Sequence, residues 1–148
     1  MALPPLPVEA IVLGATVVDW RAAVRVAGDA LVASGSARPG YAAEMIRMIE
    51  EHGPYVVIAP GLALAHARPG PEVLADGLAI VTLASPVEFG HPHNDPVHVV
   101  LGLAIKTSDE HLAAVAGLAN VFNDSTAIED IAAASSAAEV LAIMGVDS

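Results

Sequence analysis

Two nearly unbroken apolar runs most strongly constrain the fold of this chain. "GLAIVTLAS" covers residues 77–85 and "VHVVLGLAI" covers residues 97–105. Neither run alternates apolar and polar side chains, as a strand with one face in water does. Each is also much shorter than the roughly 18 residues that indicate a membrane-spanning helix. The two runs therefore predict strands of a sheet that is covered on both faces.

Helical periodicity on either side of these runs predicts what covers the sheet. Trp20, Val24, Ala27 and Leu31 recur at helical spacing, which predicts a helix from about Trp20 to Ala33. A second helix is predicted from about Tyr41 to His52, ended by Gly53-Pro54. The remaining patterns predict helices at 108–122, 128–134 and 137–144, and strands at 9–19 (with a turn at Gly14) and 55–59.

Helices and covered strands mixed within 148 residues predict an α/β fold in which a sheet is sandwiched by helices. We find no internal repeat and no linker, so we expect residues 1–148 to form a single domain. The apolar fraction is 55% and the aromatic fraction only 3%, so the core must consist mainly of Ala, Val, Leu and Ile.

Charge and cysteine content exclude several classes of protein. The 17 acidic and 6 basic residues give a formal charge of −11, which argues against nucleic-acid binding and permits a basic protein partner. Without cysteine there is no disulfide, no thiol catalysis and no Cys-ligated zinc. The N-terminal "MALPPLPVEA" lacks the basic region of a secretory signal, so we expect a cytoplasmic protein.

One histidine stands out in "VVIAPGLALAHARPGPE", residues 56–72. The segment begins as a strand, breaks at Pro60-Gly61 and then presents His66, with Arg68 as its only cation. A neutral imidazole is a competent nucleophile at neutral pH, and an arginine offers a fork for phosphate oxygens. With no catalytic triad and no phosphate-binding glycine loop, the pattern favours a phosphorylated histidine over a hydrolase. A loop histidine without a chemical role stays open.

A second histidine follows a predicted helix start. Thr107 and Glu110 fit a capping box, which puts His111 in the first turn of the helix, at the head of an apolar stripe through Leu118 and Phe122. Two interpretations remain open. The ring is either a core histidine held by one hydrogen bond, or a group at a strand-to-helix corner, where backbone N–H groups collect anions.

The other histidines favour structural interpretations. His52 ends a predicted helix, where a partly protonated ring suits the helix dipole. The segment "HPHNDPVH" superficially resembles a zinc site, but its two prolines disfavour a regular strand. We therefore favour a loop without metal, and keep a metal-binding protein as an alternative that would use His91, His93, Asp95 and His98.

The segment "GPYVVIAPGLALAHARPGPEV" resembles the active site of enzyme IIA domains of the sugar phosphotransferase system, mannitol/fructose type. The ascorbate-specific branch is the most similar, through Gly-Pro-Tyr, Ile-Ala-Pro-Gly and His-Ala-Arg-Pro. Downstream, "VEFGHPHNDPVHVVLGLAIKTSDEHLAAVAGLANVF" is similar to the same branch, and "DWRAAVRVAGDALVASG" is similar to the family's first helix. The resemblance covers nearly the whole chain.

The resemblance implies a mixed, roughly five-stranded sheet flanked by helices on both faces, forming one enzyme IIA type-2 domain. It implies that His66 is the phosphorylated nucleophile, that His111 stabilises the phosphoryl group, and that Arg68 binds phosphate. Ala65 departs from the proline that usually precedes the active histidine, so the segment loses the stiffness that proline gives.

The implied function is a phosphocarrier for sugar uptake of the ascorbate type, needing neither cofactor nor metal. HPr would be the phosphoryl donor and a separate IIB component the acceptor, which serves a membrane IIC transporter. A regulatory IIA-like phosphoprotein that is not coupled to transport is an alternative, because it would use the same His66. A homodimer also stays open.

Overall fold

The computed structural model describes residues 3–124 and 126–145. Within these ranges one five-stranded sheet has the order β1-β4-β5-β3-β2. Parallel pairs join β1 to β4 and β3 to β5, and antiparallel pairs join β2 to β3 and β4 to β5, so the sheet is mixed as expected. The strands are β1 (Ile11–Ala15), β2 (Val57–Ala59), β3 (Leu62–His66), β4 (Gly77–Val87) and β5 (Val97–Ala104).

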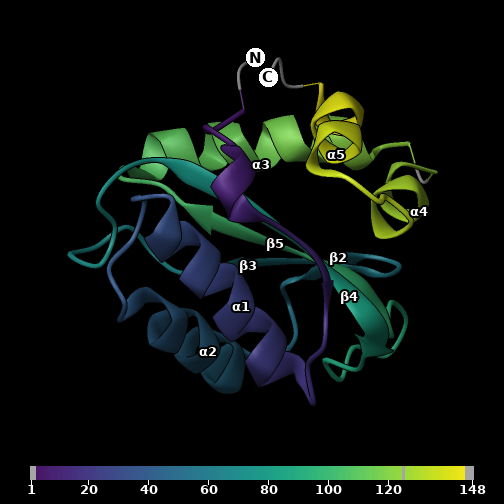
Figure 1. Ribbon diagram of the computed structural model, residues 1–148. Helices are drawn as coiled ribbons and strands as arrows, with labels where there is room; N and C mark the ends of the chain where they lie inside the picture. Colours follow the sequence, from purple (N-terminus) through teal and green to yellow (C-terminus); the bar gives the residue numbers. More distant parts are fainter. Residues whose placement is uncertain (1–2, 125, 146–148) are drawn as a thin grey trace.

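Helices cover both faces of this sheet (Figure 1). Two of them, α1 (Trp20–Ala33) and α2 (Tyr41–His52), lie together on one face. On the other lie α3 (Ser108–Phe122), α4 (Thr126–Ala132) and α5 (Ala137–Met144). In the described part of the chain, the helices all fall short of the length and apolarity that crossing a membrane requires. The predicted α/β sandwich is confirmed.

The two apolar runs form the centre of the core, as predicted. Side chains from Leu78 to Val81 in β4 and from Val99 to Leu101 in β5 are 0% exposed, so both faces of these strands are covered. Gly102 shows how closely α1 approaches, because a Cβ there would lie 3.2 Å from the Cβ of Ala27. Near the end of β4, Ala84–Pro86 are exposed.

Four of the five predicted helices have the predicted bounds, and the fifth is shifted to Thr126–Ala132. Local signals explain this accuracy. The Asp19 side chain accepts a hydrogen bond from the Ala22 amide at 2.9 Å at the start of α1. Gly53, with φ +85°, ends α2 in a conformation that other residues rarely adopt.

Two predictions about strands need correction. The strand predicted at 9–19 is a short 3-10 turn, Val8–Ala10, followed by β1. The segment after Pro60-Gly61 is not a loop but β3, an interior strand between β5 and β2. Pro60-Gly61 is a hairpin turn in which Gly61 has φ +82°. His66 therefore ends an interior strand instead of lying in a loop.

Candidate functional site

His66 is the last residue of β3 and pairs with Leu103 of β5. Its half-buried ring turns back on its own strand, with Nδ1 2.8 Å from the carbonyl oxygen of Leu64. A carbonyl only accepts hydrogen bonds, so the proton of the neutral ring lies on Nδ1 and Nε2 keeps its lone pair. Burial lowers the pKa of His66, although the bond to Leu64 opposes that shift. The ring is neutral at pH 7.

His111 reaches the same place from another part of the chain. β3 and β5 are parallel, so their carboxyl ends lie at one edge of the sheet, and α3 begins just after β5. The Thr107 side chain caps α3 by accepting from the Glu110 amide at 3.2 Å, as predicted. The rings of His66 and His111 are 5.1 Å apart between centroids and tilted by 48°. Burial and the neighbouring His66 ring both lower the pKa of His111.

The helix that carries His111 presents a mixed face. Leu118 and Phe122 are buried in the core, as the apolar stripe predicts, whereas His111 is only half-buried. Its ring makes no hydrogen bond with another described residue and lines an open pocket. The location agrees with the strand-to-helix corner that was one of the two interpretations from the sequence.

The two rings lie in a pocket of about 700 Å³. The ring of Tyr55 meets His66 edge-on, with centroids 5.6 Å apart and planes at 90°. Arg68 is exposed and forms no ion pair with any residue that the structure describes, so its guanidinium is available to an anion. The lining comprises Met48, His52, Tyr55, His66, Ala67, Arg68, Pro69, Ser108, His111 and Leu112.

The pocket rim is partly apolar. Leu112 is 70% exposed and Tyr55 is 41% exposed, so two large apolar side chains face solvent beside the two histidines. His52 ends α2 at this rim, with its Nε2 3.9 Å from a carboxylate oxygen of Glu51. Exposed apolar side chains next to the histidine pair suit a surface that receives another protein.

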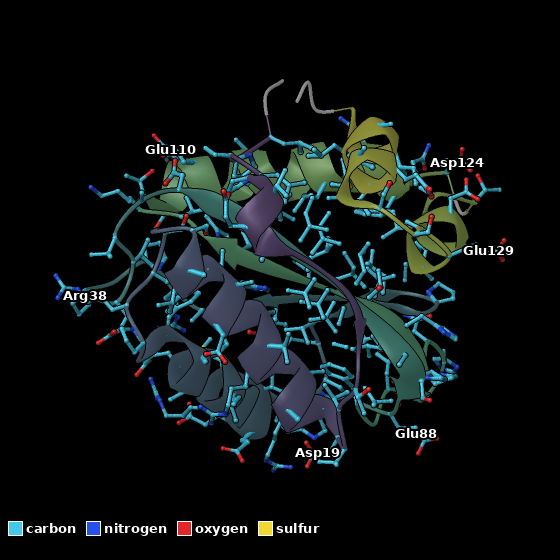
Figure 2. The ribbon with its side chains drawn as sticks, viewed as in Figure 1. Asp19, Arg38, Glu88, Glu110, Asp124 and Glu129 are labelled. Carbon is cyan, nitrogen blue, oxygen red and sulfur yellow. The ribbon has the colours of Figure 1, made fainter. Side chains whose placement is uncertain are left out.

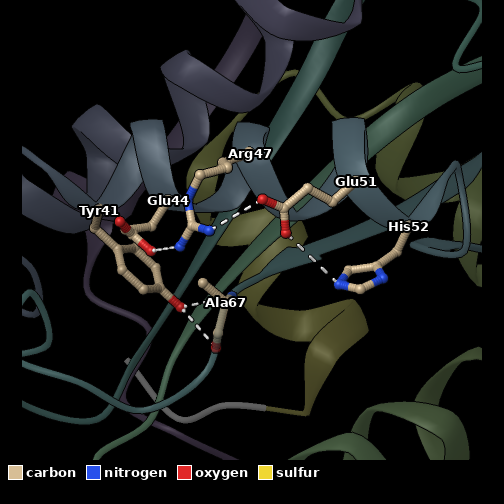
Figure 3. Close-up of polar contacts among 6 residues, drawn as sticks. All are labelled: Tyr41, Glu44, Arg47, Glu51, His52 and Ala67. Atoms are coloured by element: carbon tan, nitrogen blue, oxygen red, sulfur yellow. Dashed lines mark hydrogen bonds and ion pairs between the residues drawn. The ribbon is translucent and has the colours of Figure 1, made fainter.

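Tyr41, which the sequence did not single out, holds the chain just beyond His66 (Figure 3). Its buried hydroxyl donates to the carbonyl oxygen of Leu103 at 2.6 Å and accepts from the Ala67 amide at 3.1 Å. Burial raises the pKa of Tyr41 to about 12, although the bond to Ala67 opposes that shift. Further along α2, Arg47 is held between Glu44 and Glu51, so it is not free for an anion.

The second histidine cluster, around His91 and His93, stabilises a turn through hydrogen bonds. The Asp95 carboxylate accepts from the amides of Phe89, Gly90 and His91. Nδ1 of His91 accepts from the amides of two residues that follow it, His93 and Asn94. In the described ranges no group of three His, Asp or Glu side chains is arranged to hold a metal ion. His98, the last residue of the segment 91–98, lies in β5, in agreement with the strand predicted at 97–105.

The surface charge follows the composition. Figure 2 shows acidic side chains around the edge of the molecule, among them Asp19, Glu88, Asp124 and Glu129. Arg38 is the labelled cation. With a formal charge of −11, the molecule is suited electrostatically to a basic protein surface.

Known proteins are similar to this chain over nearly its whole length. Residues 5–145 match the family model described as "Phosphoenolpyruvate-dependent sugar phosphotransferase system, EIIA 2". The "Ascorbate-specific PTS system EIIA component" of Shigella boydii is 37% identical over 134 residues, which are 90% of this chain and 87% of that protein.

Two solved structures share the fold. A complex of enzyme IIAMTL and phosphorylated enzyme IIBMTL from Escherichia coli matches with a TM-score of 0.85 and 27% identity, covering 95% of this chain and 97% of that one. The nitrogen regulatory protein IIA-Ntr from Neisseria meningitidis matches with a TM-score of 0.80 and 28% identity, covering 94% and 95%.

Proposed function

Because the chain belongs to the EIIA type 2 family of the phosphoenolpyruvate-dependent sugar phosphotransferase system, whose members are phosphohistidine carriers, we propose that its carrier residue is His66. The observation that carries this proposal is the ring geometry of His66. Its Nδ1 is tied to Leu64 at 2.8 Å, which leaves Nε2 as the nucleophile in a pocket that His111 also lines. We take residues 1–148 as one such domain.

The first step is an in-line attack by Nε2 of His66 on the phosphorus of phospho-HPr. The new nitrogen–phosphorus bond forms as the bond to the HPr histidine breaks, and the electron pair of that bond returns to the HPr ring. The proton on Nδ1 of His66 stays in place, so the phosphorylated ring becomes more positive. The Leu64 carbonyl stabilises that charge because it accepts the same proton at 2.8 Å.

Two further groups act on the phosphoryl oxygens. His111 is neutral at pH 7, since burial and the His66 ring lower its pKa, and it donates one ring N–H to the phosphoryl group. Arg68 supplies an exposed fork of N–H donors for an incoming phosphoryl group. The chemistry depends on positioning and charge stabilisation, as is usual for phosphoryl transfer.

The second step passes the phosphoryl group to a cysteine thiolate of a separate IIB component, which serves a membrane IIC transporter. The sulfur–phosphorus bond forms as the bond to Nε2 breaks, and the electron pair returns to the His66 ring. The apolar rim around Tyr55 and Leu112 is the surface on which both partners dock in turn. These partners imply a cytoplasmic location.

The test is incubation with HPr, enzyme I and phosphoenolpyruvate, followed by mass spectrometry. The wild-type protein should gain one phosphoryl group, and the His66→Ala variant should gain none. His52→Ala is the matched control, because His52 lines the same pocket but should remain dispensable for phosphorylation. Label retained by His66→Ala at the wild-type level would refute the assignment.

The substrate branch is proposed from similarity. The 37% identity to an ascorbate-specific component favours ascorbate-type uptake. The 28% identity to IIA-Ntr motivates a regulatory protein as the second candidate. Onward transfer to purified IIB proteins distinguishes them. Rapid transfer to an ascorbate-type IIB, and slow transfer to a mannitol-type IIB, would support transport, whereas transfer to neither would support regulation.

A further inference from the structure

We propose that Tyr41 is a positioning residue for phosphoryl transfer, because its hydroxyl sets the path by which the chain leaves β3 and so orients the His66 imidazole. The inference rests on the proposed role of His66. Tyr41 is not among the residues that line the pocket. It acts through the backbone on either side of the site.

The position of the hydroxyl is unusual. Pairing between β3 and β5 ends at His66 and Leu103, and Ala67 is the first residue beyond the strand. The Ala67 amide donates to the Tyr41 hydroxyl at 3.1 Å, and the hydroxyl donates to the Leu103 carbonyl at 2.6 Å. A side-chain oxygen therefore links the two strands at the point where direct pairing stops.

All three groups of this link are shielded from water. Tyr41 and Leu103 are 1% exposed and Ala67 is 6% exposed. A hydroxyl has one proton to donate, and the Leu103 carbonyl at 2.6 Å is a much closer acceptor than the Ala67 carbonyl at 3.5 Å. Tyr41 therefore donates to Leu103 and accepts from the Ala67 amide. The buried Ala67 amide and the buried Leu103 carbonyl thus both hydrogen-bond to this one oxygen.

The tyrosine is itself rigidly placed. It is the first residue of α2, and the next residue, Ala42, packs so tightly on α1 that a Cβ at Gly28 would lie 2.5 Å from the Ala42 Cβ. The packing of α2 on α1 therefore fixes the position of the Tyr41 hydroxyl. A flexible residue in its place would not define the path of the chain.

His66 is held from two sides as a result. Its ring is hydrogen-bonded to the carbonyl oxygen of Leu64, two residues earlier, and the next amide, that of Ala67, donates to the Tyr41 hydroxyl. Without the hydroxyl, the buried Ala67 amide and the buried Leu103 carbonyl each lose a hydrogen bond, and the chain must shift to replace them. A shift of about 1 Å in a reacting group costs on the order of 10²-fold in rate.

The experiment compares Tyr41→Phe with wild-type protein in single-turnover phosphorylation by phospho-HPr. We expect the rate constant at saturation to fall by about 10- to 100-fold. The phospho-HPr concentration for half-saturation should change by less than about twofold, because the docking surface is intact. Ile131→Ala is the control for lost stability, since Ile131 is 0% exposed in α4 and lines no part of the pocket.

If Tyr41 contributed only to stability, Tyr41→Phe and Ile131→Ala would have similar effects on stability and on rate. If Tyr41→Phe and Ile131→Ala lose similar thermal stability and Tyr41→Phe keeps the wild-type rate, the inference is wrong. A fall in rate confined to Tyr41→Phe supports it. If the wild-type protein takes no phosphoryl group, the proposed function fails, and the transfer role of Tyr41 fails with it.

If Tyr41→Phe does not fold, hydrogen exchange of the wild-type protein tests whether Tyr41 holds the chain at Ala67. The Ala67 amide should exchange as slowly as the paired Leu64 amide, although Ala67 lies beyond the strand. Exchange as fast as that of the exposed Gly70 amide would show that the tyrosine does not hold the chain, and would overturn the inference.

Discussion

The His111→Ala variant distinguishes the roles of the two histidines in the pocket. The variant should fold, accept phosphate on His66 and pass it onward slowly. The reason is geometric, because the His111 ring lies 5.1 Å from the His66 ring and makes no hydrogen bond to another described residue. Its donor is therefore available to the phosphoryl group, and few core interactions depend on the ring.

The expected magnitudes follow from these contacts. Loss of one preorganised donor to a developing charge typically slows a reaction by about 10²-fold, or about 2.7 kcal/mol in activation free energy. A fully buried large side chain contributes about 1.5–3 kcal/mol, so the half-buried His111 ring should contribute roughly 1 kcal/mol to the free energy of unfolding. The kinetic effect should clearly exceed the effect on stability.

Rapid-quench measurement of transfer from phosphorylated protein to a IIB partner gives the rate, and urea unfolding gives the stability. His111→Phe keeps a ring without a donor and should be as slow as His111→Ala. His111→Gln restores an N–H donor and should recover part of the rate. Transfer by His111→Ala at the wild-type rate would show that the ring only packs, and the two-histidine mechanism would have to be abandoned.

Three further predictions concern pH, Arg68 and metal. Burial lowers the pKa of His66 below the 6.5 of an unfolded chain, so the folded protein binds fewer protons below pH 6.5. The unfolding free energy, measured by urea titration from pH 5 to 8, should be flat above pH 7 and fall as the pH drops from 6.5 towards the lowered pKa. The phosphorylation rate, measured by rapid quench, should stay flat to a lower pH and fall only as the pH approaches the lowered pKa of the folded ring. Arg68→Gln should slow phosphorylation by about 10-fold and Arg68→Lys by less, because Lys keeps the charge but not the fork; equal rates for all three proteins would exclude the role. Chelated, purified protein should hold no stoichiometric zinc, and zinc that survives chelation and is needed for folding would restore the metal site at His91 and His93.

The helix ends and the central strands were predictable from the sequence, because they depend on neighbouring residues. Asp19 and Thr107 cap helices through amides three residues onward, so the whole signal lies within one turn. The runs around Val81 and Leu101 are too apolar to face water, whatever they pair with. The resemblance to a known family supplied the sheet size and the residues of the site.

Strand β3 could not be predicted from its own sequence, because it forms through pairing with other strands. "LALAH" is rich in residues that favour helices, and nothing in the segment itself indicates a strand. It is extended because β5 and β2 pair with it on either side, and those partners come from distant and nearby parts of the chain. Propensity is a weak signal that such pairing overrides.

The site itself depends on topology. Periodicity left His111 with two interpretations, and parallel pairing of β3 with β5 brings it to the edge of the sheet where His66 ends. Tyr41 is the strongest case, because its own sequence neighbours predict only a helix face. Its hydroxyl gains a role from an amide and a carbonyl that the folded chain places around it. Local sequence determines which groups a segment offers, but the long-range pairing of strands determines which of those groups meet.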